Sequence, residues 1–240
     1  MINDHRPYWF KNLMRKFERG WAEQFVAPAF KSLGFDHHLM KPWHIRIHGK
    51  AISAGNNLHI VSDLDRKVSF STWTLNEHQG QITLGNNVLI CPGCRFDSAS
   101  AITVGDNCMF AAGSYVTDAD WHDIYDRTQA VGTTKPVTLG KNVWVGNGVT
   151  VCKGVSIGEN SVIGAGSVVV SDIPPNVIAA GNPAAVVKPL DPERELITRE
   201  RLFENPENLA REMEKIDRYV LHNNTFLDWL RSRFMPKRGD

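Results

Sequence analysis

The chain has 240 residues, of which 42% are hydrophobic, and its formal net charge at pH 7 is only +1. This length and composition allow one or two globular units with an ample apolar core. No apolar run reaches the roughly 18 residues that a membrane span needs, and no N-terminal signal peptide is visible. We therefore expect a cytoplasmic protein with no nucleic-acid partner.

Residues 1–40 are expected to form an N-terminal helical segment, with helix through about the first 35 residues. Large apolar residues recur there every four positions and form one aromatic-rich face, with lysine and arginine distributed around it. These are Trp9, Leu13, Phe17, Trp21 and Phe25. Such a helix can lie on an anionic inner membrane as a peripheral contact. It can also pack against the rest of the protein or a neighbouring subunit, and both interpretations stay open.

Residues 41–190 are expected to form a β-helix, although the pattern is weak at first. The segment from Ile45 to Ile60 resembles a degenerate first coil, and Leu84-Gly85 and Val104-Gly105 open clearer six-residue repeats. Leu84 and Val104 are 20 positions apart where three hexads would take 18. We therefore expect a two-residue bulge near residues 98–101.

Two cysteines in this region form a C-x-x-C, Cys91-Pro92-Gly93-Cys94. A zinc site of this type needs a second pair, which the chain lacks. The cysteines also fall where a hexad takes small residues, so we interpret them as packing residues and expect no metal.

A loop at residues 118–136 interrupts the hexads after Val116. Loops longer than about 12–15 residues without structure of their own are usually functional or disordered. This loop contains Asp-Ala-Asp-Trp-His-Asp, followed by Tyr125, Asp126 and Arg127. We expect the chemistry of the protein to be located there.

After the loop the repeat becomes strict, because an aliphatic residue recurs at every sixth position. The six residues are Leu139, Val145, Val151, Ile157, Ile163 and Val169. A helix needs a period of 3 to 4 and a plain strand a period of 2, whereas a period of six is a signature of the parallel β-helix. We predict a prism with three flat faces, in which the aliphatic residues point inward and the following glycines let the backbone turn.

Residues 191–240 are expected to form a C-terminal helical extension. Pro192 and the acidic residues that follow it suit a helix N-terminus. Apolar residues from Leu202 to Leu221 recur at helical spacing, which favours a helix that packs between subunits.

Several motifs in chain order resemble the hexapeptide-repeat O-acetyltransferases, a family that includes maltose and galactoside acetyltransferases and polysaccharide or lipopolysaccharide O-acetyltransferases. The motifs are Asp120-Trp121-His122, the segment from Lys135 to Gly146, the segment from Ile163 to Val169, and the segment from Asp172 to Ala184. The resemblance covers about residues 80–190. It implies a homotrimeric left-handed β-helix that transfers an acetyl group from acetyl-CoA to a hydroxyl of a saccharide, such as a lipopolysaccharide, O-antigen or capsule precursor.

A sugar hydroxyl is a poor nucleophile at neutral pH, so a general base must take its proton, and histidine suits that role. His122 occupies the position that resembles the catalytic base of the family. Asp118, Asp120 and Asp123 are candidates to hold its other ring nitrogen, and the sequence does not choose among them. On the acceptor side the resemblance implies roles for Asp97, where relatives carry an asparagine, for the loop arginine Arg127, and for Asp123.

For the donor, the resemblance implies that coenzyme A lies in a groove between two prisms. Trp144 would flank the pantetheine arm, Asn147 would lie near the thioester and Ala165 would leave room for the arm. Lys188 would meet the nucleotide phosphates. Ser171 would also contact the cofactor, although Val170-Ser171 stands where many relatives carry Thr-Lys.

Two other functions stay open. The first is an acetyltransferase that acts on an antibiotic, an amino sugar or serine. The second is a non-catalytic hexapeptide-repeat scaffold, which would not need a loop that carries His122 at the family's position.

Overall fold

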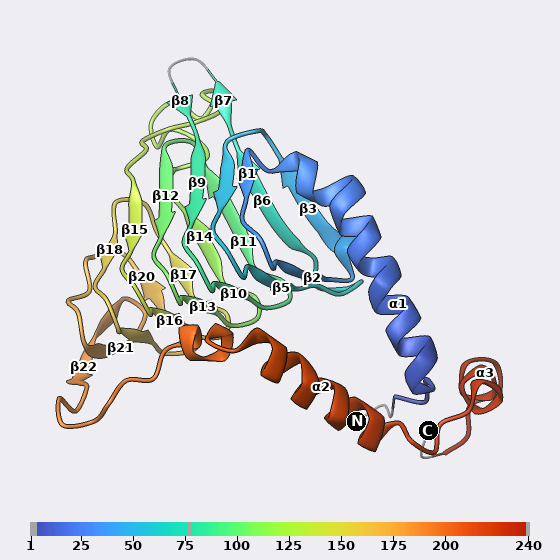
Figure 1. The fold of residues 1–240 in the computed structure, drawn as a ribbon. Coiled ribbons are helices and arrows are strands. Elements are labelled where there is room, and N and C mark those ends of the chain that lie inside the picture. The colour runs from blue at the N-terminus through green and yellow to red at the C-terminus, as the bar shows by residue number, and fades with distance from the viewer. Residues whose placement is uncertain (1–3, 76–77, 239–240) are drawn as a thin grey trace. The chain divides into compact units, whose positions relative to one another are not determined.

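The structure, a computed structural model, describes residues 4–75 and 78–238. The chain divides into two compact units, one of Trp21–Glu200 and a smaller one of Met1–Gly20 together with Arg201–Asp240. The larger unit is a parallel β-helix, as the hexads predict, and it is left-handed, as the family resemblance implies. Its short strands stack into three sheets, here called A, B and C (Figure 1).

Each coil of the β-helix contributes one strand to each sheet in turn. Sheet A contains β1 (Ser32–Leu33), β4 (Ile52–Ala54), β9 (Gln81–Leu84), β12 (Ala101–Val104), β15 (Val137–Leu139) and β18 (Ser156–Ile157). Sheet B contains β2 (His38–Met40), β5 (His59–Val61), β10 (Leu89–Ile90), β13 (Met109–Phe110), β16 (Trp144–Val145), β19 (Val162–Ile163), β21 (Val177–Gly181) and β22 (Ala184–Pro189). Sheet C contains β3 (Ile45–His48), β6 (Val68–Thr72), β11 (Arg95–Ser98), β14 (Tyr115–Thr117), β17 (Thr150–Val151) and β20 (Val168–Val169).

Two features depart from the parallel stack. A hairpin of β7 (Thr74–Leu75) and β8 (His78–Gln79) projects between β6 and β9. At the C-terminal end of the stack, β22 runs antiparallel to β21.

The interior is filled by the residues that the hexads predict. All six aliphatic residues from Leu139 to Val169 are at most 2% exposed. Further up the stack Phe70, Phe96 and Phe110 continue the column, with ring centroids 5.1 Å and 5.0 Å apart between neighbours. Burying a side chain of this size contributes roughly 1.5–3 kcal/mol, so the column is the main source of stability in this unit.

Asparagine, and not only glycine, shapes the corners between sheets A and B. Asn142 and Asn160 have φ values of 56° and 61°, a left-handed region that asparagine tolerates better than most residues. The Asn142 amide donates to the Asn160 side chain at 3.1 Å, and Asn160 donates to Asn176 at 2.8 Å. The glycine after each aliphatic residue allows close approach of neighbouring coils. At Gly140, for example, a Cβ would lie 2.7 Å from the main-chain nitrogen of Glu159 in the next coil.

The two extra residues lie near residues 98–101 as predicted, but they do not form a bulge. The two extra residues lengthen β11 to four residues, 95–98, and widen the corner that leads to β12. Coils without these residues have two-residue strands at the same place, such as β17 and β20.

The expected segment boundaries also need correction. The stack begins at Ser32, before residue 41, since β1 and β2 already pair with β4 and β5. Helix α1 covers only Tyr8–Trp21, and it is followed by the π-helical turn η1 (Ala22–Val26) and the 3₁₀ turns η2 (Ala27–Ala29) and η3 (Pro42–His44). Pro28 lacks the N–H that a continuing helix would use, which explains why helix does not extend to residue 35.

The C-terminal helix begins later than Pro192. After the 3₁₀ turn η4 (Arg199–Phe203), helix α2 spans Pro206–Val220 and helix α3 spans Phe226–Phe234. Asn205 caps α2 by accepting a hydrogen bond from the main-chain N–H of Asn208 at 3.0 Å, with Pro206 at the first helical position. The segment at Pro192 also has a side-chain cap, since Asp191 accepts from the main-chain N–H of Glu193 at 3.0 Å, but only the Asn205 cap is followed by a continuous α-helix.

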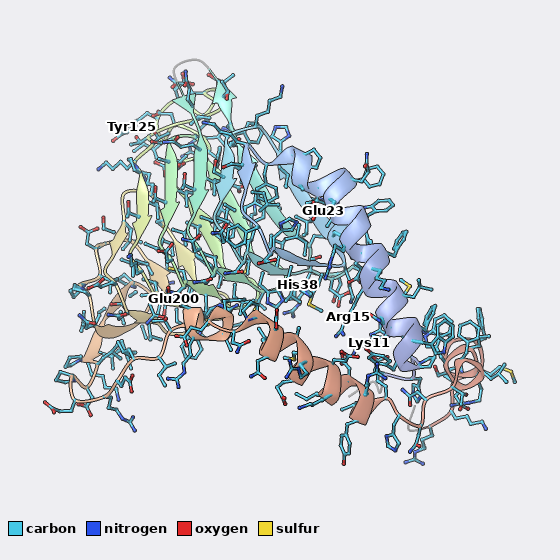
Figure 2. The ribbon with its side chains drawn as sticks, viewed as in Figure 1. Lys11, Arg15, Glu23, His38, Tyr125 and Glu200 are labelled. Carbon is cyan, nitrogen blue, oxygen red and sulfur yellow. The ribbon has the colours of Figure 1, made fainter. Side chains whose placement is uncertain are left out.

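The smaller unit has its own charged and aromatic contacts. Lys11 and Arg15 on α1 both bind the carboxylate of Asp217 on α2 (Figure 2). Phe10 packs on Trp229 with ring centroids 4.6 Å apart. No helix within the described ranges is long and apolar enough to cross a membrane.

Candidate active site

The inserted loop is anchored to the β-helix by a buried carboxylate. Asp118 accepts hydrogen bonds from the Ser98 hydroxyl at 2.6 Å and from the main-chain N–H groups of Ala99 and Ser100 at 2.7 Å and 3.0 Å. Burial raises the pKa of Asp118, although these hydrogen bonds oppose the shift. The widened corner of β11 thus provides the donors that hold the base of the loop.

Replacing this anchor should destabilise the protein. In Asp118→Ala the main-chain N–H groups of Ala99 and Ser100 lose their acceptor, while the Ser98 hydroxyl keeps the Gln81 carbonyl oxygen at 3.0 Å. An unsatisfied buried donor costs about 1–3 kcal/mol. We therefore expect a lower melting temperature, measured by calorimetry. Asp126→Ala is the control, because Asp126 is exposed and binds only loop groups; a control as destabilised as Asp118→Ala would contradict the anchoring role.

His122 lies exposed in this loop, and its ring is held by a main-chain group. Its Nδ1 is 3.1 Å from the carbonyl oxygen of Gln129. Because a carbonyl oxygen can only accept, Nδ1 must carry the proton in this contact. The lone pair of the neutral ring then lies on Nε2, which is the arrangement that a general base needs.

The three carboxylates considered as partners of this ring bind other groups. The first, at the base of the loop, is the anchor described above. Asp120 accepts from Lys153 Nζ at 2.7 Å. Asp123 accepts from the main-chain N–H groups of Tyr125 at 2.9 Å and Asp126 at 2.8 Å, and these bonds, that from Asp126 above all, lower the pKa of Asp123. The ring is therefore oriented by a carbonyl oxygen, a contact that no side-chain pattern reveals.

Asp97 is a buried carboxylate on the outer face of sheet C. It follows the inward-facing Phe96 on β11, so it points outward, yet its side chain is only 3% exposed. One oxygen accepts from the Ser71 hydroxyl at 2.5 Å. Arg95 Nε lies 2.5 Å from the other oxygen as an ion pair without hydrogen-bond geometry. That oxygen is buried and has no hydrogen-bond donor among the described residues.

Aromatic residues surround this carboxylate and connect it to the loop. Trp121 donates its indole N–H to the Tyr115 hydroxyl at 3.1 Å and lies against Trp73, with ring centroids 5.7 Å apart. Burial, with a smaller contribution from the negative charge of Asp97, raises the pKa of Tyr115.

The loop arginine lies away from this cluster. Arg127 Nε donates to the carbonyl oxygen of Ile124 at 3.4 Å, and its side chain is exposed. The neighbouring Tyr125 is 91% exposed at the outer edge of the loop (Figure 2). Over the described residues of this chain, no hydrogen bond or ion pair joins Arg127 to Asp97.

Two of the donor-site candidates lie in one row on sheet B. Trp144 pairs with Val162, Val162 with Ile178, and Ile178 with Lys188. Paired residues point to the same face, and strands are about 4.8 Å apart, so Trp144 and Lys188 are roughly 14 Å apart along this row. Both are exposed, Trp144 to 49%.

Asn147 and Ala165 lie beside this row, at the corner that joins sheet B to sheet C. The Asn147 amide donates to the carbonyl oxygen of Ala112 at 2.8 Å, and the Asn147 carbonyl accepts from Gly166 N at 2.7 Å. Ala165, next to Gly166, is exposed. These two candidates therefore occupy neighbouring coils of one corner, close to Trp144.

One protomer does not bring all candidates together. Ser171 and the loop lie at the opposite edge of sheet C, at the corner that leads to sheet A. Gly113 and Asp118 lie at the two edges of sheet C on one coil. Five residues separate them, and because a strand rises about 3.3 Å per residue, the two edges are on the order of 15 Å apart. His122 and Ser171 thus lie on one side of sheet C, and Asn147 and Ala165 on the other.

A hollow of about 500 Å³ lies on the corner between sheets B and C. Arg66, Lys67 and Arg95 line it, together with Asp65 and Asn147. Sequence reasoning missed these cations, because they come from separate coils and form no local motif. The available signal was Arg95, which precedes the inward-facing Phe96 and must therefore point outward.

The chain matches two family descriptions. Residues 136–171 match "Bacterial transferase hexapeptide (six repeats)", and residues 81–118 match "Hexapeptide repeat of succinyl-transferase". These two matches flank the inserted loop.

Solved structures of acyltransferases are similar to this chain. A maltose O-acetyltransferase from Clostridium difficile 630 is 30% identical, with 76% of this chain and 85% of that chain covered and a TM-score of 0.49. A galactoside acetyltransferase in complex with coenzyme A is 26% identical, with 75% and 78% covered and a TM-score of 0.49. A mutant of AntD, an N-acyltransferase from Bacillus cereus in complex with dTDP and coenzyme A, is 22% identical, with 80% and 96% covered and a TM-score of 0.59. The chain thus carries the hexapeptide repeats of bacterial transferases on both sides of the loop.

Proposed function

We propose that the protein transfers an acetyl group from acetyl-CoA to a hydroxyl of a saccharide, with His122 as the general base. The observation that carries the proposal is the contact between His122 Nδ1 and the Gln129 carbonyl oxygen, which leaves Nε2 as the basic atom. A scaffold would have no need for a histidine held in this way on an inserted loop.

In this mechanism His122 Nε2 takes the proton of the acceptor hydroxyl as its oxygen attacks the thioester carbon. The tetrahedral intermediate collapses, the carbon–sulfur bond breaks, and the protonated His122 returns the proton to the departing thiolate. Asp97 supports the acceptor side, where it holds the Ser71 hydroxyl and the Arg95 guanidinium in place. Arg127 and Asp123 hold the acceptor from the loop.

The donor site uses the row on sheet B and the corner beside it. Trp144 flanks the pantetheine arm, Asn147 lies at the thioester end and Ala165 leaves room for the arm. Lys188 binds the phosphates at the other end of the row, and Ser171 contacts the donor from a neighbouring protomer. This direction, with phosphates towards β22 and thioester towards Asn147, follows from the order of the residues along the stack.

The working enzyme in this proposal is a homotrimer. The base and the donor corner lie at opposite edges of sheet C in one protomer, while bond formation requires contact at about 3 Å. A neighbouring copy supplies the missing edge when the loop of one protomer meets the corner of the next.

The test is release of free coenzyme A thiol from acetyl-CoA and from a longer acyl-CoA. Each donor is assayed with sugars, nucleotide sugars, an amino sugar, serine and an aminoglycoside. Thiol release with a saccharide, together with an acetyl ester in the product, supports the proposal. An acetamide in the product would show that the acceptor group is an amine. Turnover with serine or the antibiotic alone would show that the acceptor is not a saccharide. No acyl transfer to any acceptor by a protein that binds coenzyme A would favour the scaffold.

The proposal also places the protein at the inner face of an anionic membrane through α1. Trp9, Leu13 and Phe17 are each more than half exposed, and the basic residues Lys16 and Arg19 are exposed beside them. A helix with these two features binds anionic lipid, and three copies in one trimer would add avidity.

Replacing Trp9, Leu13 and Phe17 together by alanine should abolish sedimentation with anionic vesicles, and salt should weaken binding by the unaltered protein. Turnover on a soluble acceptor should survive. Leu196→Ala with Ile197→Ala, two exposed apolar residues of the larger unit, should leave sedimentation unchanged. If the triple variant instead loses its trimer, the face packs between subunits and the membrane role is wrong.

A further inference from the structure

The hollow on the corner between sheets B and C has an excess of positive charge. Its lining includes three cations, Arg66, Lys67 and Arg95, and one carboxylate, Asp65. Of the cations, Arg95 has the ion pair with Asp97 described above. No ion pair is formed by the side chains of Arg66 and Lys67 with any described residue of the chain. With Arg95 paired to Asp97, the excess charge at this place comes from Arg66 and Lys67, against the single carboxylate of Asp65.

The position of the hollow relates it to the proposed reaction. The corner continues from coil to coil through main-chain hydrogen bonds: Gly166 N to Asn147 O, Gly148 N to Ala112 O, Gly113 N to Pro92 O, and Gly93 N to Arg66 O. Asn147 therefore marks the point where the donor residues end and the lining of the hollow begins. The hollow extends from there towards the N-terminal end of the stack, away from Lys188.

This order excludes the hollow from the proposed path of the donor. The donor phosphates would lie at Lys188, roughly 14 Å from Trp144 on the C-terminal side, and the thioester would lie near Asn147. The group that lies beyond the thioester on the same corner is the acceptor. A neutral sugar would leave Arg66 and Lys67 without an anionic partner, whereas a phosphoryl group would pair with both through charge-assisted hydrogen bonds.

We propose that the hollow formed by Arg66, Lys67 and Arg95 binds the phosphate or diphosphate of a glycosyl phosphate acceptor, with the sugar extending towards Asn147. This inference rests on the proposed function, since it names the substrate class of the same site. The shared ligand chemistry is a glycosyl diphosphate, and it can be carried by a nucleoside or by a lipid.

Binding is measured by calorimetry on the full-length protein saturated with coenzyme A, so that turnover is not needed. The probes are inorganic pyrophosphate, uridine diphosphate and farnesyl diphosphate. The variant is Arg66→Ala with Lys67→Ala, which leaves Arg95 and Asp97 in place. The matched control is Arg194→Ala with Lys141→Ala, one arginine and one lysine, both exposed elsewhere in the same unit.

We expect pyrophosphate to bind the unaltered protein and the control equally. The Arg66/Lys67 variant should bind it at least about tenfold more weakly, because two charge-assisted contacts are lost. Tighter binding of uridine diphosphate than of pyrophosphate identifies a nucleotide-linked acceptor, and tighter binding of farnesyl diphosphate identifies a lipid-linked one.

Two outcomes would overturn the inference. In the first, pyrophosphate does not bind, or binds both variants alike, while acetyl transfer to an uncharged saccharide proceeds; the proposed function then stands without this site. In the second, the Arg66/Lys67 variant weakens coenzyme A binding itself, which would assign the hollow to the donor. Loss of acetyl transfer on every acceptor with pyrophosphate binding intact would instead refute the proposed function and leave the anion site.

Discussion

His122→Ala is expected to lower kcat by about 10²–10⁴-fold, the usual contribution of a general base, while binding of acetyl-CoA stays nearly unchanged. The acceptor hydroxyl would have to attack without giving up its proton to Nε2. The measurement is steady-state thiol release together with calorimetric titration of the donor. A kcat within about threefold of the unaltered enzyme would show that His122 is not the base.

The chain offers a matched control for this variant. His222 in the smaller unit is also exposed, and its Nδ1 lies 2.7 Å from the carbonyl oxygen of Tyr219. Its ring is therefore held in the same way, but it lies outside the β-helix. His222→Ala should leave kcat unchanged, which separates the position of His122 from the general effect of losing a bound imidazole.

Mixed trimers are expected to regain activity from two inactive variants. His122→Ala removes the base, and Ala165→Trp fills the corner where the donor arm would lie. If each site combines the loop of one protomer with the corner of the next, refolding a 1:1 mixture restores about a quarter of the sites. Each variant alone should stay inactive, and light scattering should give a mass near three times 26.9 kDa.

The control is to mix the two variants after each has folded alone, which should give no recovery until the trimers are dissociated. Absence of recovery after joint refolding, with trimers present, would place the base and the donor on the same protomer. A fully active monomer would contradict the shared site altogether.

The hexads made the β-helix predictable because the same physical demand repeats in every coil. Each aliphatic residue from Leu139 to Val169 fills the same narrow interior, so six positions report one structure. The earliest coil was missed although Leu33, Leu39 and Ile45 are six positions apart, because three positions form a short repeat that directly follows the aromatic helical stretch. The start of the C-terminal helix was misplaced because the segment at Pro192 has the composition of a helix start and even a side-chain cap from Asp191, while the α-helix forms only after the cap at Asn205.

The site was predictable only where a single residue type is needed for the chemistry. His122 could be proposed from its position after the hexads, but the group that orients its ring is a main-chain oxygen, which any residue supplies. The cations of the hollow come from two separate stretches of the chain, Arg66-Lys67 and Arg95, and only the stacking of coils brings them together. In the sequence Asp118 is one of several charged residues of the loop. In the structure it anchors the loop, because the widened corner places the Ser98 hydroxyl where it donates to Asp118.

The antiparallel strand β22 also limits how the molecule can grow. A stack of parallel coils ends in open edges whose unpaired N–H and C=O groups could accept the first coil of another copy, and repeated addition would produce a fibre. In sheet B the chain turns back after Gly181, and β22 pairs against β21 in the opposite direction. An incoming coil would therefore meet a strand of the wrong polarity at this edge. The turn at the end of the solenoid thus acts as a terminator that disfavours head-to-tail polymerisation and keeps association to the sides of the prism.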